Sequence, residues 1–410
     1  MPETLPESGI PCRARPPVRC CHTDAVDLET FRWLLTDDGQ HLLARASEAP
    51  EDPLRAQTEL RRTSDPAHVA AALTQVTLRR RAEEKFGEDA ARMYFTPEGL
   101  EQATRRPVAA HRAARLTAAS TRSVVDLGCG IGGDLMATAR AGIICAGVDL
   151  DPVRVAVAEA NLAALGLAGA VMVADATAMD TGPFDVAFAD PARRTGRGRT
   201  FDVDDWTPPW PFVEGLLRRD ACVKVAPGIP HDLVPEGVEA EWVSDHGEVK
   251  EAALWSGRLA TTRRRATVIG HGGLATLTED DDPGADVLPV RRFLYEPDGA
   301  VIRAGLVTAV AAAAHGGLVD THIAYVTSDV PVDTPFARGF EVLEELPYRE
   351  KPLRGALRER GVGTLTIKKR GVNVVPEQLR KRLALTGDTP ATIVLTRAAG
   401  RGTALLVRPL

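Results

Sequence analysis

A glycine-rich stretch at residues 124–151 constrains the fold of this chain more than any other part of its sequence. It reads as a buried strand, a glycine loop, a helix and a second strand. Three glycines follow the first strand with single residues between them: Gly128, Gly130 and Gly132. Glycine lets the backbone turn sharply and lets a ligand approach its N–H groups. The second strand ends at Asp149, where an acid can hydrogen-bond a ribose diol in a βαβ unit.

Acidic residues lie at or near the ends of four apolar runs that we expect to be parallel strands. They are Asp126, Asp149, Asp175 and Asp190. The carboxyl ends of parallel strands share one edge of a sheet, and ligands of open α/β sheets bind at that edge. The pattern therefore predicts an α/β fold with a ligand site among these acids. A tight turn that merely needs glycine is the alternative interpretation of the loop.

The octapeptide DLGCGIGG at residues 126–133 resembles the first motif of class I S-adenosylmethionine-dependent methyltransferases. The resemblance implies a Rossmann-like, seven-stranded methyltransferase sheet with S-adenosyl-L-methionine as cofactor. It assigns cofactor contacts to seven residues: Asp126, Gly128, Gly130, Gly132, Asp149, Asp175 and Ala176. The glycine loop and the acid before it would hold the methionine part, Asp149 the ribose hydroxyls, and Asp175 with Ala176 the adenine edge.

The loop after the fourth expected strand is where such enzymes place the methyl acceptor. Amino-directed nucleobase methyltransferases carry N/D-P-P-Y/F/W there, with the aromatic ring stacked on the base. This chain keeps Asp190 and Pro191 but has Ala192 and Arg193 in place of the second proline and the aromatic residue. The resemblance implies that Asp190 orients or deprotonates the acceptor. Arg193 departs from the motif and could stack on the base by its guanidinium plane or hold a phosphate instead. A loop carboxylate without a chemical role is the alternative.

Arginines continue beyond this loop in the sequence RRTGRGR. After Arg193 they are Arg194, Arg197 and Arg199. Guanidinium groups separated by glycine suit contacts with substrate phosphates, whereas the alternative is a solvated loop that offsets nearby acids. Trp206 and Trp210 follow, and each could stack on a base or pack in the core.

A second polar cluster lies at residues 244–251. His246, Glu248 and Lys250 alternate along an expected strand, so their side chains could converge on a substrate pocket. An ordinary amphipathic edge strand is the alternative.

Neither the cysteines nor the candidate metal-binding residues of the chain indicate metal-dependent or covalent catalysis. The six cysteines are unevenly placed and form no disulfide framework. A metal could bind a cluster near the N-terminus, but no second ligand pair follows it: Cys12, Cys20, Cys21 and His22. Cys129 and Cys222 lie outside any nucleophile loop, and in-line methyl transfer needs neither a metal nor a covalent residue.

Composition and patterning divide the chain into four expected parts. They are an unstructured tail at 1–23, a helical N-terminal region at 24–118, a methyltransferase domain at 119–275 and a smaller α+β domain at 287–410. The segment Phe95-Thr96-Pro97-Glu98 resembles one that helps close the cofactor pocket in trimethylguanosine synthases. Residues 249–255 and 265–269 are expected to form the closing antiparallel pair of the sheet.

The C-terminal part contains a basic stretch at residues 349–382, with eleven positive and three negative side chains. Within it, LTIKKRGVNVVPEQLRKRL resembles the THUMP-like domain appended to a family of bacterial methyltransferases. True THUMP domains bind RNA. The resemblance implies that Lys368, Lys369 and Arg370 dock RNA phosphates.

Length and composition narrow the class further. No apolar run approaches the roughly 18 residues of a membrane span, and we expect a cytoplasmic protein without a secretory signal. The net charge of −6 does not by itself indicate nucleic-acid binding. The sequence therefore predicts an S-adenosylmethionine-dependent methyltransferase that acts on a tRNA or rRNA base. A methyltransferase of small molecules or proteins, and an RNA-binding protein with an inactive methyltransferase fold, are the alternatives.

Overall fold

The computed structural model describes residues 27–50, 52–193 and 206–410, except for the side chains at positions 192, 193 and 206. The chain divides into two compact units, residues 1–74 and 75–410, with the boundary inside helix α4 (Pro66–Phe86). The expected tail at 1–23 lies outside the described residues. Among those residues, no helix has the length and apolar character that a membrane span requires.

The described part of the first unit is helical, as expected. Besides the start of α4 it contains α1 (Leu28–Leu34), α2 (Asp37–Glu48) and α3 (Pro53–Leu60). Each of the three short helices begins at a residue whose side-chain oxygen accepts a backbone N–H: Asp27, Thr36 and Asp52. Their apolar faces are buried through Phe31, Leu34 and Leu42, which holds the helices together.

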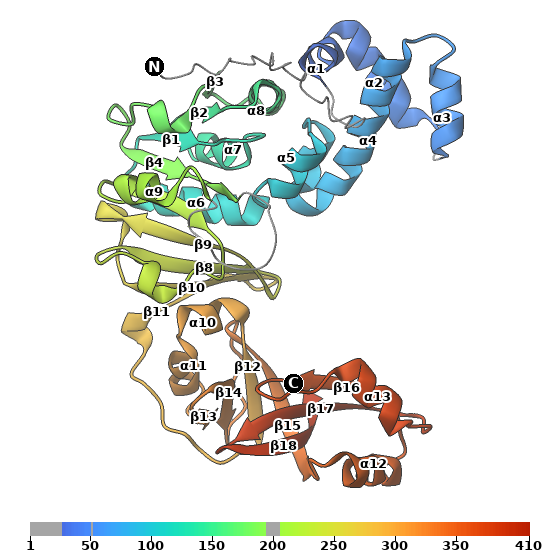
Figure 1. The fold of residues 1–410 in the computed structure, drawn as a ribbon, viewed down its shortest axis with the longest axis vertical. Helices are drawn as coiled ribbons and strands as arrows, with labels where there is room; N and C mark the ends of the chain where they lie inside the picture. Colours follow the sequence, from blue (N-terminus) through green and yellow to red (C-terminus); the bar gives the residue numbers. More distant parts are fainter. Residues whose placement is uncertain (1–26, 51, 194–205) are drawn as a thin grey trace, which may run out of the picture. The chain divides into compact units, whose positions relative to one another are not determined.

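A nine-stranded sheet lies in the second unit, in the order β11-β10-β8-β9-β7-β4-β1-β2-β3 (Figure 1). Its strands are β1 (Ser123–Leu127), β2 (Ile144–Asp149), β3 (Ala170–Val173), β4 (Val186–Ala189), β7 (Ala221–Val225), β8 (Glu239–Asp245), β9 (Glu248–Ser256), β10 (Arg264–Gly270) and β11 (Gly273–Thr278). The strands β1, β2, β3, β4 and β7 are parallel, and β9 is antiparallel to both of its neighbours.

The seven strands from β8 to β3 confirm the predicted Rossmann-like α/β core. Two expectations about its edge are wrong. Strands β10 and β11 extend the sheet beyond the seven strands, and residues 249–255 do not pair with 265–269, because β8 lies between them. The pattern concealed β8 because Glu239 and Glu241 interrupt its apolar residues, although all seven residues of the strand are buried.

Helices cover both faces of this sheet. They are α5 (Pro97–Gln102), α6 (Arg106–Ala118), α7 (Gly133–Arg140), α8 (Pro152–Leu165) and α9 (Trp210–Leu216). Successive side chains of a strand point to opposite faces. Val124 and Phe188 therefore share a core cluster with Leu116 of α6, whereas Val125 shares another with Val213 of α9.

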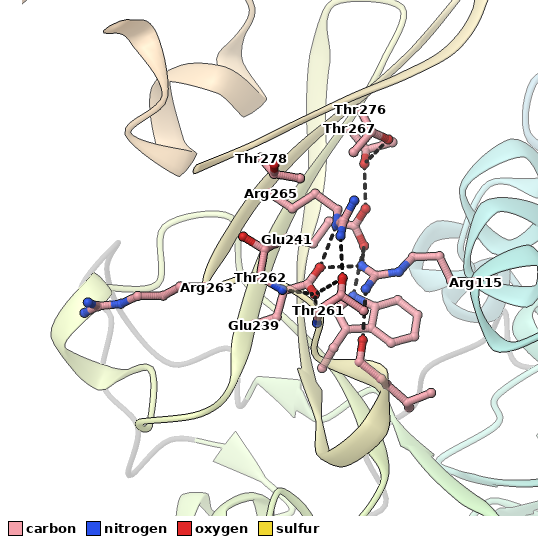
Figure 2. Close-up of polar contacts among 12 residues, drawn as sticks. Arg115, Glu239, Glu241, Thr261, Thr262, Arg263, Arg265, Thr267, Thr276 and Thr278 are labelled. Carbon is pink, nitrogen blue, oxygen red and sulfur yellow. Dashed lines mark hydrogen bonds and ion pairs between the residues drawn. The ribbon is translucent and has the colours of Figure 1, made fainter. Parts of the chain in front are cut away.

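Two buried glutamates on β8 join the sheet to α6 (Figure 2). Arg115 Nη1 of α6 lies 2.8 Å from Glu239 Oε1 and 2.7 Å from Glu241 Oε2. Glu241 also accepts hydrogen bonds from the Trp255 indole at 2.9 Å and from the Thr267 hydroxyl at 2.6 Å. Buried charges are tolerated when they are paired and hydrogen-bonded in this way, so the network fixes α6 on the sheet.

A second, seven-stranded sheet follows, in the order β13-β14-β12-β15-β18-β17-β16. Its strands are β12 (Phe293–Pro297), β13 (Gly317–Asp320), β14 (Ile323–Ser328), β15 (Ala337–Leu346), β16 (Val362–Lys369), β17 (Thr389–Ala398) and β18 (Arg401–Pro409). Its helices are α10 (Gly299–Ala304), α11 (Val307–Ala313), α12 (Glu350–Glu359) and α13 (Pro376–Leu383). This architecture confirms a smaller α+β part at the C-terminal end.

Helix α10 connects the two sheets of the second unit. Val301 of α10 and Trp242 of β8 belong to one continuous apolar core. At the margin of that core, Arg264 donates to the carbonyl of Ala304 at 3.2 Å, and Arg303 donates to the carbonyl of Pro227 at 3.1 Å. The C-terminal half is therefore attached to the loop that follows β7.

The glutamate network yields a prediction about stability. Burial would raise the pKa of Glu241, but His111, Arg115 and Thr267 outweigh it and lower this pKa well below its usual range. Glu241→Gln removes a buried, paired charge, so we expect the free energy of unfolding at pH 7 to fall by about 3 kcal/mol.

The lowered pKa also fixes the pH dependence of this effect. The stabilisation is present above the ordinary glutamate pKa and disappears as the pH falls through the lower folded-state value. Denaturant unfolding of both proteins across the acid range measures it. The matched control is Glu344→Gln, which removes an exposed pair with Arg360 and should cost about 1 kcal/mol or less. Equal losses in the two variants would contradict the role of Glu241.

Candidate functional site

A cavity of about 990 Å³ lies at the carboxyl ends of β1, β2, β3, β4 and β7. It collects eight of the residues that the sequence selected. Those that line it are Asp126, Gly128, Gly130, Asp149, Asp175, Ala176, Asp190 and Pro191. They come from four neighbouring strand ends, so the fold brings together side chains that are up to 65 positions apart in the sequence. Their individual roles stay predictions.

The glycine loop between β1 and α7 depends on backbone conformations that favour glycine. The φ angles are 100° at Gly128, 54° at Gly130 and 86° at Gly132. A Cβ at Gly130 would meet nothing within 4 Å, so this Cα faces open space in the cavity. A Cβ at Gly132 would lie 3.3 Å from that of Ala158. Gly132 therefore packs closely against α8 and does not line the cavity, unlike the other two glycines.

Asp149 at the end of β2 is held by two backbone N–H groups. Its Oδ2 accepts a hydrogen bond from Gly130 at 3.0 Å, and its Oδ1 accepts one from Asp151 at 2.9 Å. Each carboxylate oxygen has a further lone pair. The side chain is thus fixed next to the glycine loop and can still accept hydrogen bonds from a diol.

Asp126 is the most unusual group in the cavity wall. Its side chain is 3% exposed, and its Oδ1 has no hydrogen-bond partner among the described residues. Burial, together with Asp134 and Asp190, raises its pKa well above the ordinary value, against the opposing effect of Arg112. A buried carboxyl oxygen without a partner is costly. A ligand ammonium group would supply the missing partner, which fits the amino group of S-adenosyl-L-methionine.

Asp175 lies at the rim, just beyond β3. Its Oδ1 accepts hydrogen bonds from the Thr177 hydroxyl at 2.7 Å and the Thr177 N–H at 2.8 Å, which lower its pKa. These bonds hold the start of the short helical turn at Ala176–Ala178. The carboxylate and the backbone of Ala176 therefore keep a fixed position at the edge of the cavity.

The structure adds a residue that the sequence analysis missed. Lys224 of β7 extends its ammonium group to Asp190 Oδ2 at 2.6 Å and to the Thr104 hydroxyl at 3.1 Å. Burial would lower the pKa of Lys224, but Asp190 and nearby carboxylates outweigh it and raise the value. The sequence did contain a signal for this residue. A lysine interrupts the apolar run ACVKV, and a lysine in a buried strand needs a partner for its charge.

The charge of the cavity favours a cationic ligand. Among the described residues that line it, eight carry carboxyl groups and three carry basic groups. The carboxyl groups belong to Glu101, Asp126, Asp134, Asp149, Asp151, Asp175, Asp190 and Glu251. A concave surface of one sign concentrates ligands of the opposite sign. The donor set therefore fits a sulfonium compound that also carries an ammonium group.

The segment before the sheet forms another wall of the cavity. Gly99 and Thr104 line it, whereas none of the four residues at 95–98 is part of the lining. The amide of Gln75 hydrogen-bonds both backbone groups of Phe95, at 2.6 and 3.0 Å. Asn161 of α8 bonds both Tyr94 backbone groups, at 2.7 and 3.1 Å, and also donates to the Ile131 carbonyl at 3.0 Å. One buried asparagine thus ties this wall to the glycine loop.

Several predicted acceptor-side residues cannot be placed. Arg193 lies in β5 (Ala192–Arg193), which pairs with β6 (Trp206–Thr207), but its side chain and that of Trp206 lie outside the description. The other arginines of this loop lie outside the described residues: Arg194, Arg197 and Arg199. Cys12, Cys20, Cys21 and His22 lie outside them as well. Trp210 is buried in the core beneath the sheet, which favours the packing interpretation.

The cluster at 244–251 does not converge. Lys250 lines the cavity and pairs with Glu248, which is exposed. His246 lies in the turn between β8 and β9, where it pairs with Asp245. The three residues do not alternate along one strand, because β8 ends at Asp245 and β9 begins at Glu248, which leaves His246 in the turn.

The thiols next to the cavity are not activated. Burial, together with Asp126 and Asp149, raises the pKa of Cys129. Burial likewise raises the pKa of Cys222 to about 12. A nucleophilic cysteine requires the thiolate, so these environments argue against covalent catalysis.

The expectation for Lys368, Lys369 and Arg370 needs correction. Lys368 and Arg370 both pair with Glu296, and they lie against the rings of Phe340 and Tyr325. Only Lys369 is exposed, because alternate residues of β16 face opposite sides of the sheet. Lys368 and Arg370 are therefore engaged within the domain, and Lys369 is the exposed member of the three.

Family models match three parts of the chain. Residues 27–82 match a domain of unknown function, residues 124–193 a methyltransferase domain, and residues 337–409 a THUMP domain-like family. Two curated proteins, from two strains of Mycobacterium tuberculosis, are each 42% identical to the chain over 333 residues. The alignment covers 78% of this chain and 90% of each relative. Both relatives are described as uncharacterized S-adenosylmethionine-dependent methyltransferases.

A solved structure shares the fold along nearly the whole chain. It is a candidate methyltransferase from Porphyromonas gingivalis, with a TM-score of 0.70 and 22% sequence identity. The superposition covers 93% of this chain and 97% of the other. At this identity the likeness concerns the fold alone.

The partnerless Asp126 generates a prediction about proton release. Burial and the neighbouring carboxylates raise the pKa of Asp126, and a bound ammonium group would lower that pKa and displace any proton that the carboxyl carries in the free protein. We therefore expect S-adenosyl-L-methionine to bind with net proton release and with an affinity that increases with pH. Calorimetry in buffers of different ionisation enthalpy measures the protons released. Asp126→Asn should abolish the release, and an unchanged release in this variant would contradict the assignment.

Proposed function

Because the chain belongs to the S-adenosylmethionine-dependent methyltransferases, we propose that it methylates a nucleobase of RNA. S-adenosyl-L-methionine is its cofactor and supplies the methyl group from a sulfonium centre. In this proposal Asp126, Asp149 and Asp175 hold the cofactor. Asp190 faces the acceptor at the same strand edge and accepts a hydrogen bond from it. RNA is the proposed substrate class, with tRNA or rRNA as the first substrates to test.

The observation that carries the proposal is the basic surface on the THUMP-like part of the chain. Helices α12 and α13 pack side by side on β16 and β17, with Leu353 and Leu379 in a common core. Arg382 of α13 forms an ion pair with Glu350 of α12 at 2.8 Å. The exposed basic residues of this part include Lys351, Arg358, Lys369, Arg380 and Lys381. Exposed basic side chains suit phosphate contacts, which position a nucleic acid without reading its sequence.

The acidic cavity favours one kind of acceptor within RNA. A phosphate would be repelled by the carboxylates that line the cavity, whereas an uncharged base would not. Enzymes that modify bases draw a single nucleotide out of its stack into a pocket. The basic surface and the acidic cavity therefore support two separate roles. The basic surface would bind the RNA backbone, and the cavity would admit the base.

The proposal is tested on RNA from cells with and without this protein. We expect mass spectrometry of nucleosides to reveal one methylated base that is lost without the protein and restored by the wild-type chain. Purified protein should transfer labelled methyl groups to RNA from the deficient cells, and Asp149→Ala should weaken cofactor binding by a few kcal/mol at most. Cofactor binding without any transfer to RNA would instead favour a small-molecule or protein acceptor. Binding of both cofactor and RNA without transfer to any acceptor would favour the inactive fold.

The basic surface is tested by its salt dependence. The triple variant Lys351→Ala, Lys369→Ala and Lys381→Ala should bind RNA more weakly, with a slope of log K against log salt reduced by about 0.7–0.9 per lost phosphate contact. The control removes three exposed charges from the first unit: Arg55→Ala, Arg61→Ala and Arg62→Ala. Filter binding across a salt series compares the variants. A triple lysine variant with the slope of the control would contradict docking on this surface.

A further inference from the structure

We propose that Lys224 is a positioning residue that sets the Asp190 carboxylate relative to the glycine loop. Its ammonium group would tie the carboxylate that faces the acceptor to the helix that begins beneath the cofactor. This inference rests on the proposed function, because it takes Asp190 as the group that meets the acceptor. It goes beyond that function by naming what fixes the alignment of the two reactants.

A continuous polar chain carries the inference. From Lys224, one contact reaches Asp190 at 2.6 Å and another reaches the Thr104 hydroxyl at 3.1 Å. The Thr104 hydroxyl in turn donates a hydrogen bond to Asp134 Oδ2 at 2.7 Å. Asp134 lies in the first turn of α7, directly after the glycine loop. The acceptor loop after β4 and the cofactor loop after β1 are thus connected by three hydrogen-bonded contacts.

The far end of the chain is anchored on α6 and the sheet. Arg112 Nε of α6 lies 2.9 Å from Asp134 Oδ1, and Arg112 Nη2 lies 2.8 Å from Glu251 Oε1 on β9. Arg112 and Glu251 are both buried. Asp134, which is otherwise buried among carboxylates, has a lowered pKa because Arg112, Lys224 and Thr104 outweigh its burial. The fixed end of the chain therefore does not depend on any exposed side chain.

Stability alone does not account for a charge at this position. The side chain of Lys224 is 16% exposed, and Cys222, Val223 and Val225 of the same strand are buried. Replacing a buried ion pair with apolar groups is often neutral for stability. What an apolar residue cannot do is hold one oxygen of Asp190 and leave the other for the acceptor. Misplacing a reacting group by about 1 Å can cost about 100-fold in rate.

A double-mutant cycle tests the inference in the full-length protein. We compare methyl transfer to RNA by the wild type, Lys224→Met, Asp190→Asn and the double variant. Lys224→Met should lower kcat by about 10- to 100-fold and leave the Kd for S-adenosylhomocysteine within about 3-fold, roughly 0.7 kcal/mol. In the Asp190→Asn background, the same substitution should have little further effect. Lys224→Arg keeps the charge and should recover much of the lost rate.

Equal fold-losses in the two backgrounds would overturn the inference, because Lys224 would then act independently of Asp190. A second measurement needs neither an acceptor nor the methionine variant. In protein labelled with ¹⁵N-lysine, the Nζ resonance of Lys224 should titrate above the ordinary lysine range and move toward it in Asp190→Asn. If Lys224 titrates in the ordinary lysine range and its pKa is the same in Asp190→Asn, the pairing of the two groups is overturned. A wild type that binds the cofactor, shows the paired lysine and methylates no RNA would overturn the proposed function instead.

Discussion

The neutralisation of carboxylates at one sheet edge is the constraint on which the rest of the structure depends. Parallel strands deliver Asp126, Asp149 and Asp190 to the same place, and α7 adds Asp134. Such a cluster is stable only if cations or protons balance it. Arg112 and Lys224 supply part of that balance. The negative charge that these two residues do not balance is available to a cationic ligand. The fold of the sheet is thereby linked to the binding of a sulfonium cofactor.

Other parts of the chain hold this sheet edge in place or are attached next to it. The Arg115–Glu241 network fixes α6, and α6 in turn carries Arg112, which pairs with Asp134 of the cavity lining. On the other side, Arg303 of α10 and the Trp242 indole both donate to the Pro227 carbonyl, next to the cavity. The THUMP-like part is thus attached through the loop that follows β7. The exposed basic residues of the THUMP-like part and the acidic cavity belong to one compact unit, residues 75–410.

The sequence predicted the features that have a local motif or an alternating pattern. It missed the features that depend on pairing between distant residues. The glycine loop and the acids at strand ends have local signatures, so the α/β class, the cofactor and eight of the residues that line the cavity were found. Strand β8 escaped because its buried glutamates look like surface residues until Arg115, more than 120 positions away, is seen to pair with them. Lys224 and the pairing of Lys368 with Glu296 were missed for the same reason. Ion pairs between distant elements leave no periodic pattern in a single sequence.

A crystal structure of the full chain with S-adenosylhomocysteine bound would test the central claim most directly. The account predicts that the ligand fills the cavity at the ends of β1, β2 and β4. Its ammonium group should contact the Oδ1 of Asp126, its ribose should contact Asp149, and its sulfur should be directed toward Asp190. A ligand bound elsewhere, or a ligand in this cavity with its sulfur turned away from Asp190, would contradict the account.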